Sequence, residues 1–334
     1  MITENLVLIL GAGASHPYGY PLGSRLRHLL LDNGLLNPDQ ELRSVLSELG
    51  YDDGVLEFRA RFQETRLPTI DEFLAGASEL EIAIGKIAIS WLILSREHPV
   101  YLDTGEFGGM HDHWYEKLWQ QMRAGTDRNN FGALNNVRVI TFNYDRSLER
   151  FFFTAIQSTF QVDDATALDL LHSAMRINHV YGVVGSPRQY GWDQPSATLV
   201  SEAAKNITVI PDGGDEDDPY LDDLRSMITG ADKVCFLGFG YHDVNLRILK
   251  FPEVVSKSKV FGYHHVDLQR IGFPEIAAKP KVFGTVFRLG RARAQRAEHL
   301  VGGFDGGFPE NTWNCSQLLE NRHVLWMWPA ELMK

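Results

Sequence analysis

The chain has 334 residues, of which 44% are hydrophobic and 22% charged, and its 32 Lys and Arg against 43 Asp and Glu give a formal net charge of −11. This composition is typical of a globular protein and excludes a mostly disordered or collagen-like chain. An acidic surface disfavours stand-alone binding to a nucleic acid backbone. The length fits two domains of about 150 residues each, or one large α/β domain with insertions.

Cysteine content and hydropathy exclude further classes of protein. The two cysteines, Cys235 and Cys315, can form neither a four-cysteine zinc site nor a disulfide framework. The first residues lack the basic and small-residue features of a signal peptide. The longest apolar stretch, at 82–94, is interrupted by glycine, lysine and serine and is too short for a membrane span. We therefore expect a soluble, cytoplasmic protein with no membrane partner.

Apolar runs along the chain predict a parallel sheet. Residues 6–10 form a continuous apolar run that ends in a glycine loop, as in a strand buried on both faces. Leucines at helical spacing follow Pro21, so strand, loop and helix form the start of a βα unit. Further strands are predicted at 137–142, 207–210 and 233–237, with candidate edge strands at 259–263 and 281–287.

The segment at about 50–125 has a helical pattern instead. A helix with Asp71 and Glu72 in its first turn is predicted to run to residue 94, and another at 114–122. The expected fold is α/β, a Rossmann-like parallel sheet with helices on both faces. We expect one domain over residues 1–334, with this helical insertion and a C-terminal extension at about 250–334.

Loops after the predicted strands are candidate ligand sites, because open parallel sheets bind ligands at the carboxyl ends of their strands. The loop from Gly11 to Ser15 lacks the third glycine of a dinucleotide fingerprint, since His16 stands in its place, and it is no Walker A loop. Its two glycines still allow backbone amides to approach a pyrophosphate. A tight turn without a ligand is the alternative.

Five motifs follow one another in the chain: GAGASHPYGYP at 11–21, TIDEFL at 69–74, TFNYD at 141–145, NHVYGVVGS at 178–186 and GFGYHDVNL at 238–246. Their order resembles the sirtuin-like family, in particular a bacterial branch that hydrolyses NAD in anti-phage defence. The likeness covers about residues 6–249.

The resemblance implies roles for individual residues. Asn143 matches the family asparagine beside the nicotinamide ribose, and Asp145 matches its acidic neighbour. The loop after the first strand would contact the NAD pyrophosphate, and the loop at 238–246 would lie near the adenosine or gate the pocket. The implied NAD-binding residues are Gly11, Ala12, Gly13, Ser15, Gly19, Pro21, Tyr181, Gly238, Asp243 and Asn245. Asp243 and Asn245 have a second interpretation as helix caps.

The catalytic histidine departs from the family pattern. The family histidine directly precedes a glycine, whereas here Tyr181 precedes Gly182 and His179 lies two residues earlier. Residues i and i+2 of a strand share a face, so both can reach one pocket. We predict His179 as the catalytic histidine, with Tyr181 as the alternative. The protein-deacylating members carry a four-cysteine zinc module that two cysteines cannot build, which favours simple glycohydrolysis without a metal.

The chemistry of these residues fits this reaction. Cleavage of the nicotinamide–ribose bond passes through an oxocarbenium-like state. Nicotinamide leaves as a neutral molecule, so the site needs a positioned water and a base near neutral pKa. Asn143 donates and accepts hydrogen bonds without charge, and His179 accepts a proton near pH 7. Asp145 can orient the ribose or stabilise positive charge, and both it and Asn143 can also cap a helix.

The sequence therefore predicts an NAD⁺ glycohydrolase that forms nicotinamide and ADP-ribose, with NAD as substrate. The resemblance further implies an effector of anti-phage defence that acts as a homo-oligomer. It also implies a separate regulatory protein, such as a HerA-type ATPase or a short Argonaute. Two alternatives are a module that senses NAD or ADP-ribose without turnover and an NAD-dependent protein deacylase.

Overall fold

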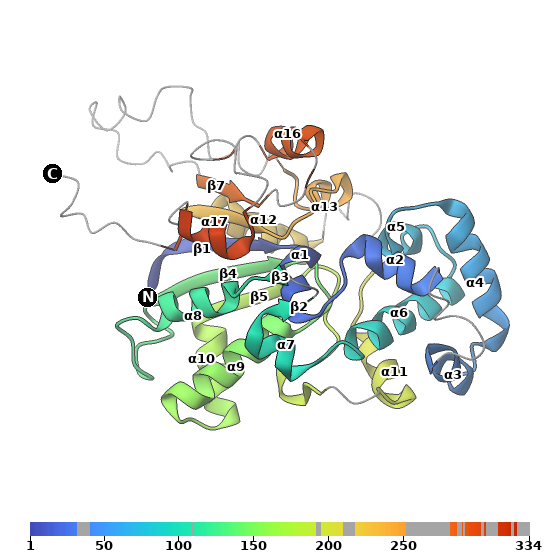
Figure 1. Cartoon of the computed structure of the whole chain (residues 1–334), viewed down its shortest axis with the longest axis horizontal. Coiled ribbons are helices and arrows are strands. Elements are labelled where there is room, and N and C mark those ends of the chain that lie inside the picture. Colours follow the sequence, from blue (N-terminus) through green and yellow to red (C-terminus); the bar gives the residue numbers. More distant parts are fainter. Residues whose placement is uncertain are drawn as a thin grey trace.

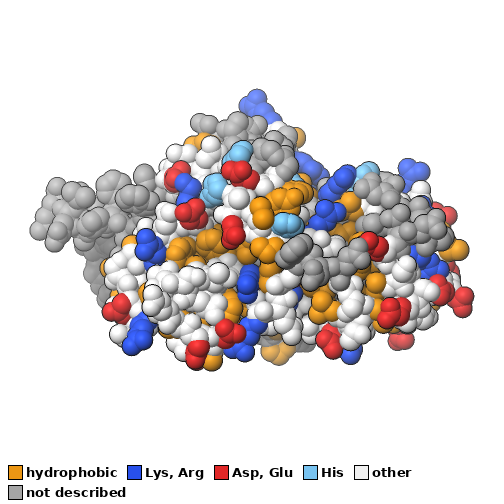
Figure 2. Space-filling view, turned by 60° about the horizontal axis from the view of Figure 1, so that its bottom comes forward, with side chains coloured by type: hydrophobic (Ala, Val, Ile, Leu, Met, Phe, Trp, Pro, Cys, Tyr) orange, Lys and Arg blue, Asp and Glu red, His pale blue; other side chains and the backbone are white. Residues whose placement is uncertain are grey.

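A computed structural model gives the structure of this chain (Figure 1). It describes residues 1–31, 41–107, 110–191, 195–209, 218–251, 281–285, 289, 291–301, 304, 313–321 and 324–325. In these parts of the chain, no helix is long and apolar enough to cross a membrane. On the face in Figure 2, hydrophobic side chains gather across the middle, and acidic and basic side chains are interspersed around them.

A five-stranded parallel sheet forms the centre of the fold, in the order β5-β4-β1-β6-β7. The strands are β1 (Ile2–Leu10), β4 (Asn135–Thr141), β5 (Met175–His179), β6 (Lys233–Leu237) and β7 (Lys281–Gly284). Helices pack on both faces (Figure 1). The predicted α/β, Rossmann-like architecture is confirmed.

The register of the sheet brings three strand ends together. Leu10 at the end of β1 pairs with Thr141 on one side and Leu237 on the other. The apolar run of β1 is buried from Leu6 onward, as a central strand covered on both faces requires. The loops that follow β1, β4 and β6 therefore emerge side by side at one edge of the sheet.

The chain between β1 and β4 is mainly helical. Its elements are α1 (Ala12–Ser15), a 3-10 turn (His16–Tyr18), α2 (Gly23–Leu31), α3 (Glu41–Glu48), α4 (Asp52–Thr65), α5 (Ile70–Leu74), α6 (Glu79–Leu94), α7 (Pro99–Thr104), the hairpin β2 (Glu106–Phe107) and β3 (Met110–His111), and α8 (Trp114–Arg123). Figure 1 shows α2 to α6 grouped beside the sheet, with α11 from later in the chain against α6.

The remaining helices follow the strands of the sheet. They are α9 (Ser147–Phe160), α10 (Asp164–Ala174), a 3-10 turn (Pro187–Gln189), α11 (Ala197–Lys205), α12 (Pro219–Thr229), α13 (Asp243–Ile248), α16 (Arg291–Leu300) and α17 (Cys315–Asn321). Helices α9 and α10 connect β4 to the parallel edge strand β5, which is the crossover that parallel pairing requires.

Two predicted elements were wrong. The helix predicted up to residue 94 is divided into α5 and α6, because Ser78 begins α6 with a capping box in which its side chain and that of Glu81 bond each other's backbone amides. The strand predicted at 207–210 is absent from its described part, 207–209. Ile207 forms only an isolated antiparallel bridge with Gly182, and Thr208 donates to the carbonyl of Tyr181.

The candidate edge strands had different outcomes. Strand β7 lies within the predicted range 281–287, and it ends at Gly284 with Thr285 outside the strand. Residues 286–288 and the other candidate edge strand, 259–263, lie outside the described residues.

Candidate active site

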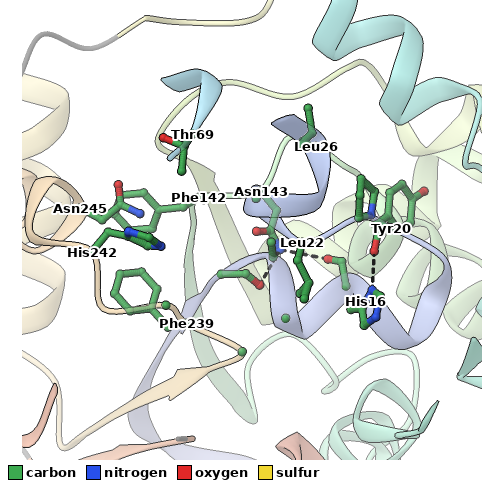
Figure 3. A pocket seen from close by; sticks show the side chains of 18 of the residues that line it. His16, Tyr20, Leu22, Leu26, Thr69, Phe142, Asn143, Phe239, His242 and Asn245 are labelled. Atoms are coloured by element: carbon green, nitrogen blue, oxygen red, sulfur yellow. Dashed lines mark hydrogen bonds between the residues drawn. The ribbon is translucent and has the colours of Figure 1, made fainter. Parts of the chain in front are cut away.

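A cavity of about 430 Å³ lies where β1, β4 and β6 end (Figure 3). Its walls come from the loop after β1, the residues after β4 and the loop after β6. Thr69 and Asp71 from the helical region add to one side, and Arg293 and Cys315 come from the C-terminal part of the chain. Segments far apart in the sequence thus share one concave site, where ligands bind in open parallel sheets.

The loop after β1 and the loop after β6 contact each other so closely that they need glycines. The Gly11 amide donates to the Leu237 carbonyl at 3.1 Å, and the Gly13 amide donates to the Gly238 carbonyl at 2.9 Å. A Cβ at Gly238, whose φ is +57°, would lie 1.9 Å from the Ala14 nitrogen. The Ala14 amide donates to the Gly11 carbonyl. Three amides of the predicted pyrophosphate loop therefore already have partners in the protein.

Asn143 projects from the end of β4 into this cavity and is only 7% exposed. Its Nδ2 donates to the Gly11 carbonyl and to Ser15 Oγ, both at 3.0 Å (Figure 3). With both amide hydrogens used, Oδ1 is the atom that Asn143 offers to a ligand, and it can only accept a hydrogen bond. A hydroxyl, a water or a carboxamide N–H suits this position.

His179 lies outside the cavity lining, at the end of β5. Its Nδ1 donates to the Asn143 carbonyl at 2.8 Å, and its Nε2 donates to Glu149 Oε1 at 2.6 Å. Both partners accept, so both ring nitrogens carry hydrogen and no lone pair is left to take a proton. Burial acts to lower the pKa of His179, but the charge and hydrogen bond of Glu149 prevail and raise it.

Tyr181, two residues on, does line the cavity. Strand β5 ends at His179, and Gly182 turns the chain with a φ of +79°. The two side chains therefore do not share one face, as residues i and i+2 of a continuous strand would. The Tyr181 hydroxyl donates to Asn245 Oδ1 at 2.8 Å, and the ring stacks with that of Tyr144 at 6.0 Å between centroids.

Asp145 reaches the cavity from the same loop as Asn143 and is buried. Its Oδ1 accepts hydrogen bonds from the Ser147 amide, at 3.1 Å, and from the Ser147 hydroxyl at the start of α9. Burial raises the pKa of Asp145, and the hydrogen bonds from Ser147 and Ser15 oppose this shift. The side chain therefore binds the first residue of α9 and lines the cavity at the same time.

Aromatic side chains form one wall of the cavity: Phe142, Tyr144, Tyr181 and Phe239. The Tyr144 hydroxyl donates to Asp71 Oδ1, which holds α5 of the helical region against the end of β4. Burial raises the pKa of Asp71, and the hydrogen bond from Tyr144 lowers it. This wall offers flat apolar surface for planar rings of a ligand, with a carboxyl group beside it.

Of the predicted NAD-binding residues, eight line the cavity: Gly11, Ala12, Gly13, Ser15, Pro21, Tyr181, Gly238 and Asn245. Gly19 and Asp243 do not. Gly19 adopts a φ of +97° to end the 3-10 turn, and a Cβ there would lie 2.9 Å from the Tyr101 ring. Asp243 is exposed and forms an ion pair with Arg296.

Several cavity residues had no role predicted from the sequence, and three of them carry an ionisable side chain that matters below. Asp71 belongs to one of the motifs but has no assigned role there, His242 precedes the predicted pair Asp243 and Asn245, and Arg293 lies on α16. Arg293 is the only Lys or Arg among the described lining residues and is exposed to solvent. In the described residues no group of three or more His, Cys, Asp or Glu could hold a metal ion.

A buried ion pair supports the loop beside the site. Arg146 Nε and Nη2 donate to the two carboxylate oxygens of Glu97 at 2.7 and 2.9 Å, and Nη1 donates to the Ser186 carbonyl at 2.7 Å. The loop then leads to Tyr190, whose hydroxyl bonds that of Tyr20 at 3.0 Å. The position of Tyr20, which lines the cavity, thus depends through Tyr190 on the Arg146–Glu97 pair.

Comparison with known proteins adds no family to this picture: no protein-family model and no curated protein matches the chain.

Proposed function

We propose that this protein is an NAD⁺ glycohydrolase that cleaves NAD⁺ into nicotinamide and ADP-ribose, the activity implied by its resemblance to the sirtuin-like family. One observation carries the proposal. The Oδ1 of Asn143, which accepts no hydrogen bond from the residues that the structure describes, and the carboxyl group of Asp145 lie in the same cavity as the loop from Gly11 to Ser15. This is the grouping that NAD⁺ hydrolysis needs, a hydrogen-bond acceptor beside the sugar and an acidic group near the positive charge that develops.

The other lining residues fit the remaining parts of NAD⁺. The aromatic wall of Phe142, Tyr144, Tyr181 and Phe239 provides a surface for the planar bases. The Arg293 guanidinium supplies positive charge for the diphosphate, a role that the engaged amides of Gly11 and Gly13 do not fill. Asn143 Oδ1 accepts from a ribose hydroxyl or from the attacking water.

The same resemblance supports a biological role. In this proposal the protein acts on cytoplasmic NAD⁺ as an effector of anti-phage defence. It acts as a homo-oligomer, under control of a separate protein such as a HerA-type ATPase or a short Argonaute. Co-purification with such a partner, followed by NAD⁺ measurement in infected cells, tests this part of the proposal.

The enzymatic proposal is tested by nicotinamide release from NAD⁺. Asn143→Ala is expected to lower kcat about 100-fold or more, by analogy with the loss of one positioned polar group at a reacting centre. Asn129→Ala, in an exposed turn, is the matched control and should keep wild-type activity. Calorimetric titration with NAD⁺ checks that the Asn143 variant still folds and binds.

A second function is favoured by the position of His179. Because its ring lies outside the cavity and both nitrogens are bonded, the chain would serve equally as a module that senses NAD or ADP-ribose without turnover. Tight NAD⁺ binding without nicotinamide release in every assembly state would support the sensor. Turnover of an acetylated peptide would instead support the deacylase alternative.

A further inference from the structure

We infer that His242 is the residue that accepts the proton of the attacking water. This inference rests on the proposed NAD⁺ hydrolysis. It concerns a residue that none of the sirtuin-like motifs assigns to catalysis here.

His242 lies in the loop after β6, directly before α13. Its half-buried ring lines the cavity, on the wall that also carries Phe239 and Asn245, and Asn143 projects into the same cavity (Figure 3). The ring packs over Gly240, where a Cβ would lie 2.8 Å from Cδ2 and 2.9 Å from Nε2 of His242. The glycine therefore leaves the space that the imidazole occupies.

The three carboxyl groups among the described cavity residues each accept hydrogen bonds from the protein. Asp71 accepts from Tyr144, Asp112 accepts from the amides of Cys315 and Ser316, and Asp145 accepts from Ser147. Arg293 has no basic lone pair.

His16 is the remaining histidine of the lining, and it is held at the opposite side of the view from His242. Its Nδ1 donates to the Tyr20 carbonyl at 2.8 Å (Figure 3). Its ring also packs edge-on against that of Phe107. No hydrogen bond joins the His242 ring to any residue that the structure describes.

The surroundings of His242 favour its neutral form. Burial lowers the pKa of this histidine, and Arg293 on α16 lowers it further, whereas Glu72 on α5 and the adjacent Asp243 act to raise it. A neutral imidazole keeps one nitrogen lone pair, so His242 can accept a proton at neutral pH.

The step balances without a further reactant. The water oxygen bonds to C1′ of the ribose as the bond from C1′ to the nicotinamide nitrogen breaks. Nicotinamide keeps the electron pair of that bond and leaves as a neutral molecule. The water proton passes to His242 and then to solvent, so the products are nicotinamide, ADP-ribose and one proton.

The test compares His242→Gln with wild-type protein in nicotinamide release. A positioned base contributes about 100-fold or more, so kcat is expected to fall by that factor with KM changed less than about threefold. The wild-type kcat should decline at acidic pH as His242 becomes protonated, and the variant should lack this decline. His172→Gln, exposed on α10, is the matched control.

Two further variants separate proton transfer from folding. Imidazole added to His242→Ala should restore part of the release. Gly240→Ala, which keeps the histidine but displaces its ring, should lower kcat about tenfold or more by misplacing the base. Unchanged NAD⁺ binding in calorimetry shows that these variants remain folded. If His242→Gln does not bind NAD⁺, imidazole rescue of His242→Ala decides whether His242 accepts the proton.

The outcomes distinguish this inference from the function on which it rests. Wild-type kcat and an unchanged pH profile in His242→Gln overturn the role of His242 alone. Loss of activity in His16→Gln but not in His242→Gln would assign the proton to the other histidine. A wild-type protein that binds NAD⁺ and never releases nicotinamide overturns both proposals.

Discussion

The imidazole of His179 donates to the backbone carbonyl of Asn143 at 2.8 Å, while its other nitrogen donates to Glu149 on α9 at 2.6 Å. The Asn143 side chain in turn donates to the Gly11 carbonyl. A continuous series of hydrogen bonds therefore runs from α9 through the end of β5 to the loop after β1. His179 positions the residue that faces the cavity.

His179→Gln is expected to lower the free energy of unfolding by about 2–3 kcal/mol, because a buried charge-assisted hydrogen bond is lost. The pKa of His179 in the folded state is raised above its ordinary 6.5 by Glu149 against the effect of burial. The stabilisation is thus complete below about pH 6.5 and is lost as the pH rises through the higher folded value. Urea unfolding of both proteins at pH 6 and pH 9 measures this stabilisation. A difference in the free energy of unfolding between wild type and variant that grows with pH would contradict the prediction.

Gly238→Ala is expected to destabilise the protein by at least about 3 kcal/mol, since the new Cβ would meet the backbone of Gly13 and Ala14 and separate the two loops. Gly125→Ala is the matched control, because that glycine also has a positive φ, +70°, but nothing lies within 4 Å of its Cβ position. It should cost only about 1 kcal/mol of backbone strain. Equal losses in thermal unfolding would refute the loop contact as the reason for Gly238.

Arg293→Gln should raise KM for NAD⁺ about tenfold, the effect of losing one charge-assisted hydrogen bond to phosphate, with kcat unchanged. The effect should shrink at high salt, because the guanidinium is exposed. The KM for nicotinamide riboside, which lacks the diphosphate, should be the same in wild type and variant. Arg296→Gln, on the same helix but paired with Asp243, is the control. A similar KM increase with both nucleotide and nucleoside would remove Arg293 from diphosphate binding.

Arg146→Met is expected to cost about 3–5 kcal/mol, because it leaves the buried Glu97 carboxylate without its cation. The double variant Arg146→Met with Glu97→Leu should recover only part of this, since the carbonyl of Ser186 and the amide of Gly191 also lose their partners. Arg176→Met, from an exposed ion pair, should cost less than about 1 kcal/mol. Denaturant unfolding of all three variants provides the comparison, and full recovery in the double variant would be inconsistent with these contacts.

The central strands were predictable, because a strand covered on both faces has a continuous apolar sequence. Strand β5 was not named in advance. Its sequence, Met-Arg-Ile-Asn-His, carries three polar residues, and it lies at an edge of the sheet. The division between α5 and α6 depends on a single serine cap within an otherwise helical pattern.

The cavity was predictable only where it is built from strand ends. Asn143 follows β4 and Gly11 follows β1, so the pairing of these strands brings them together. Asp71 and Arg293 come from a helical segment and a late helix, and no local pattern shows that these face the same space. His179 and Tyr181 were expected to share one face as residues i and i+2 of a strand. They do not, because the strand ends at His179.

The same cavity includes Gly11 near the start of the chain and Cys315 in α17, where Asp112 accepts the amides of Cys315 and Ser316. During synthesis, the ribosome must therefore release nearly the whole polypeptide before this enclosure exists. A nascent or prematurely terminated chain cannot form the complete pocket. Any chemistry of the pocket therefore begins only after translation has passed α17.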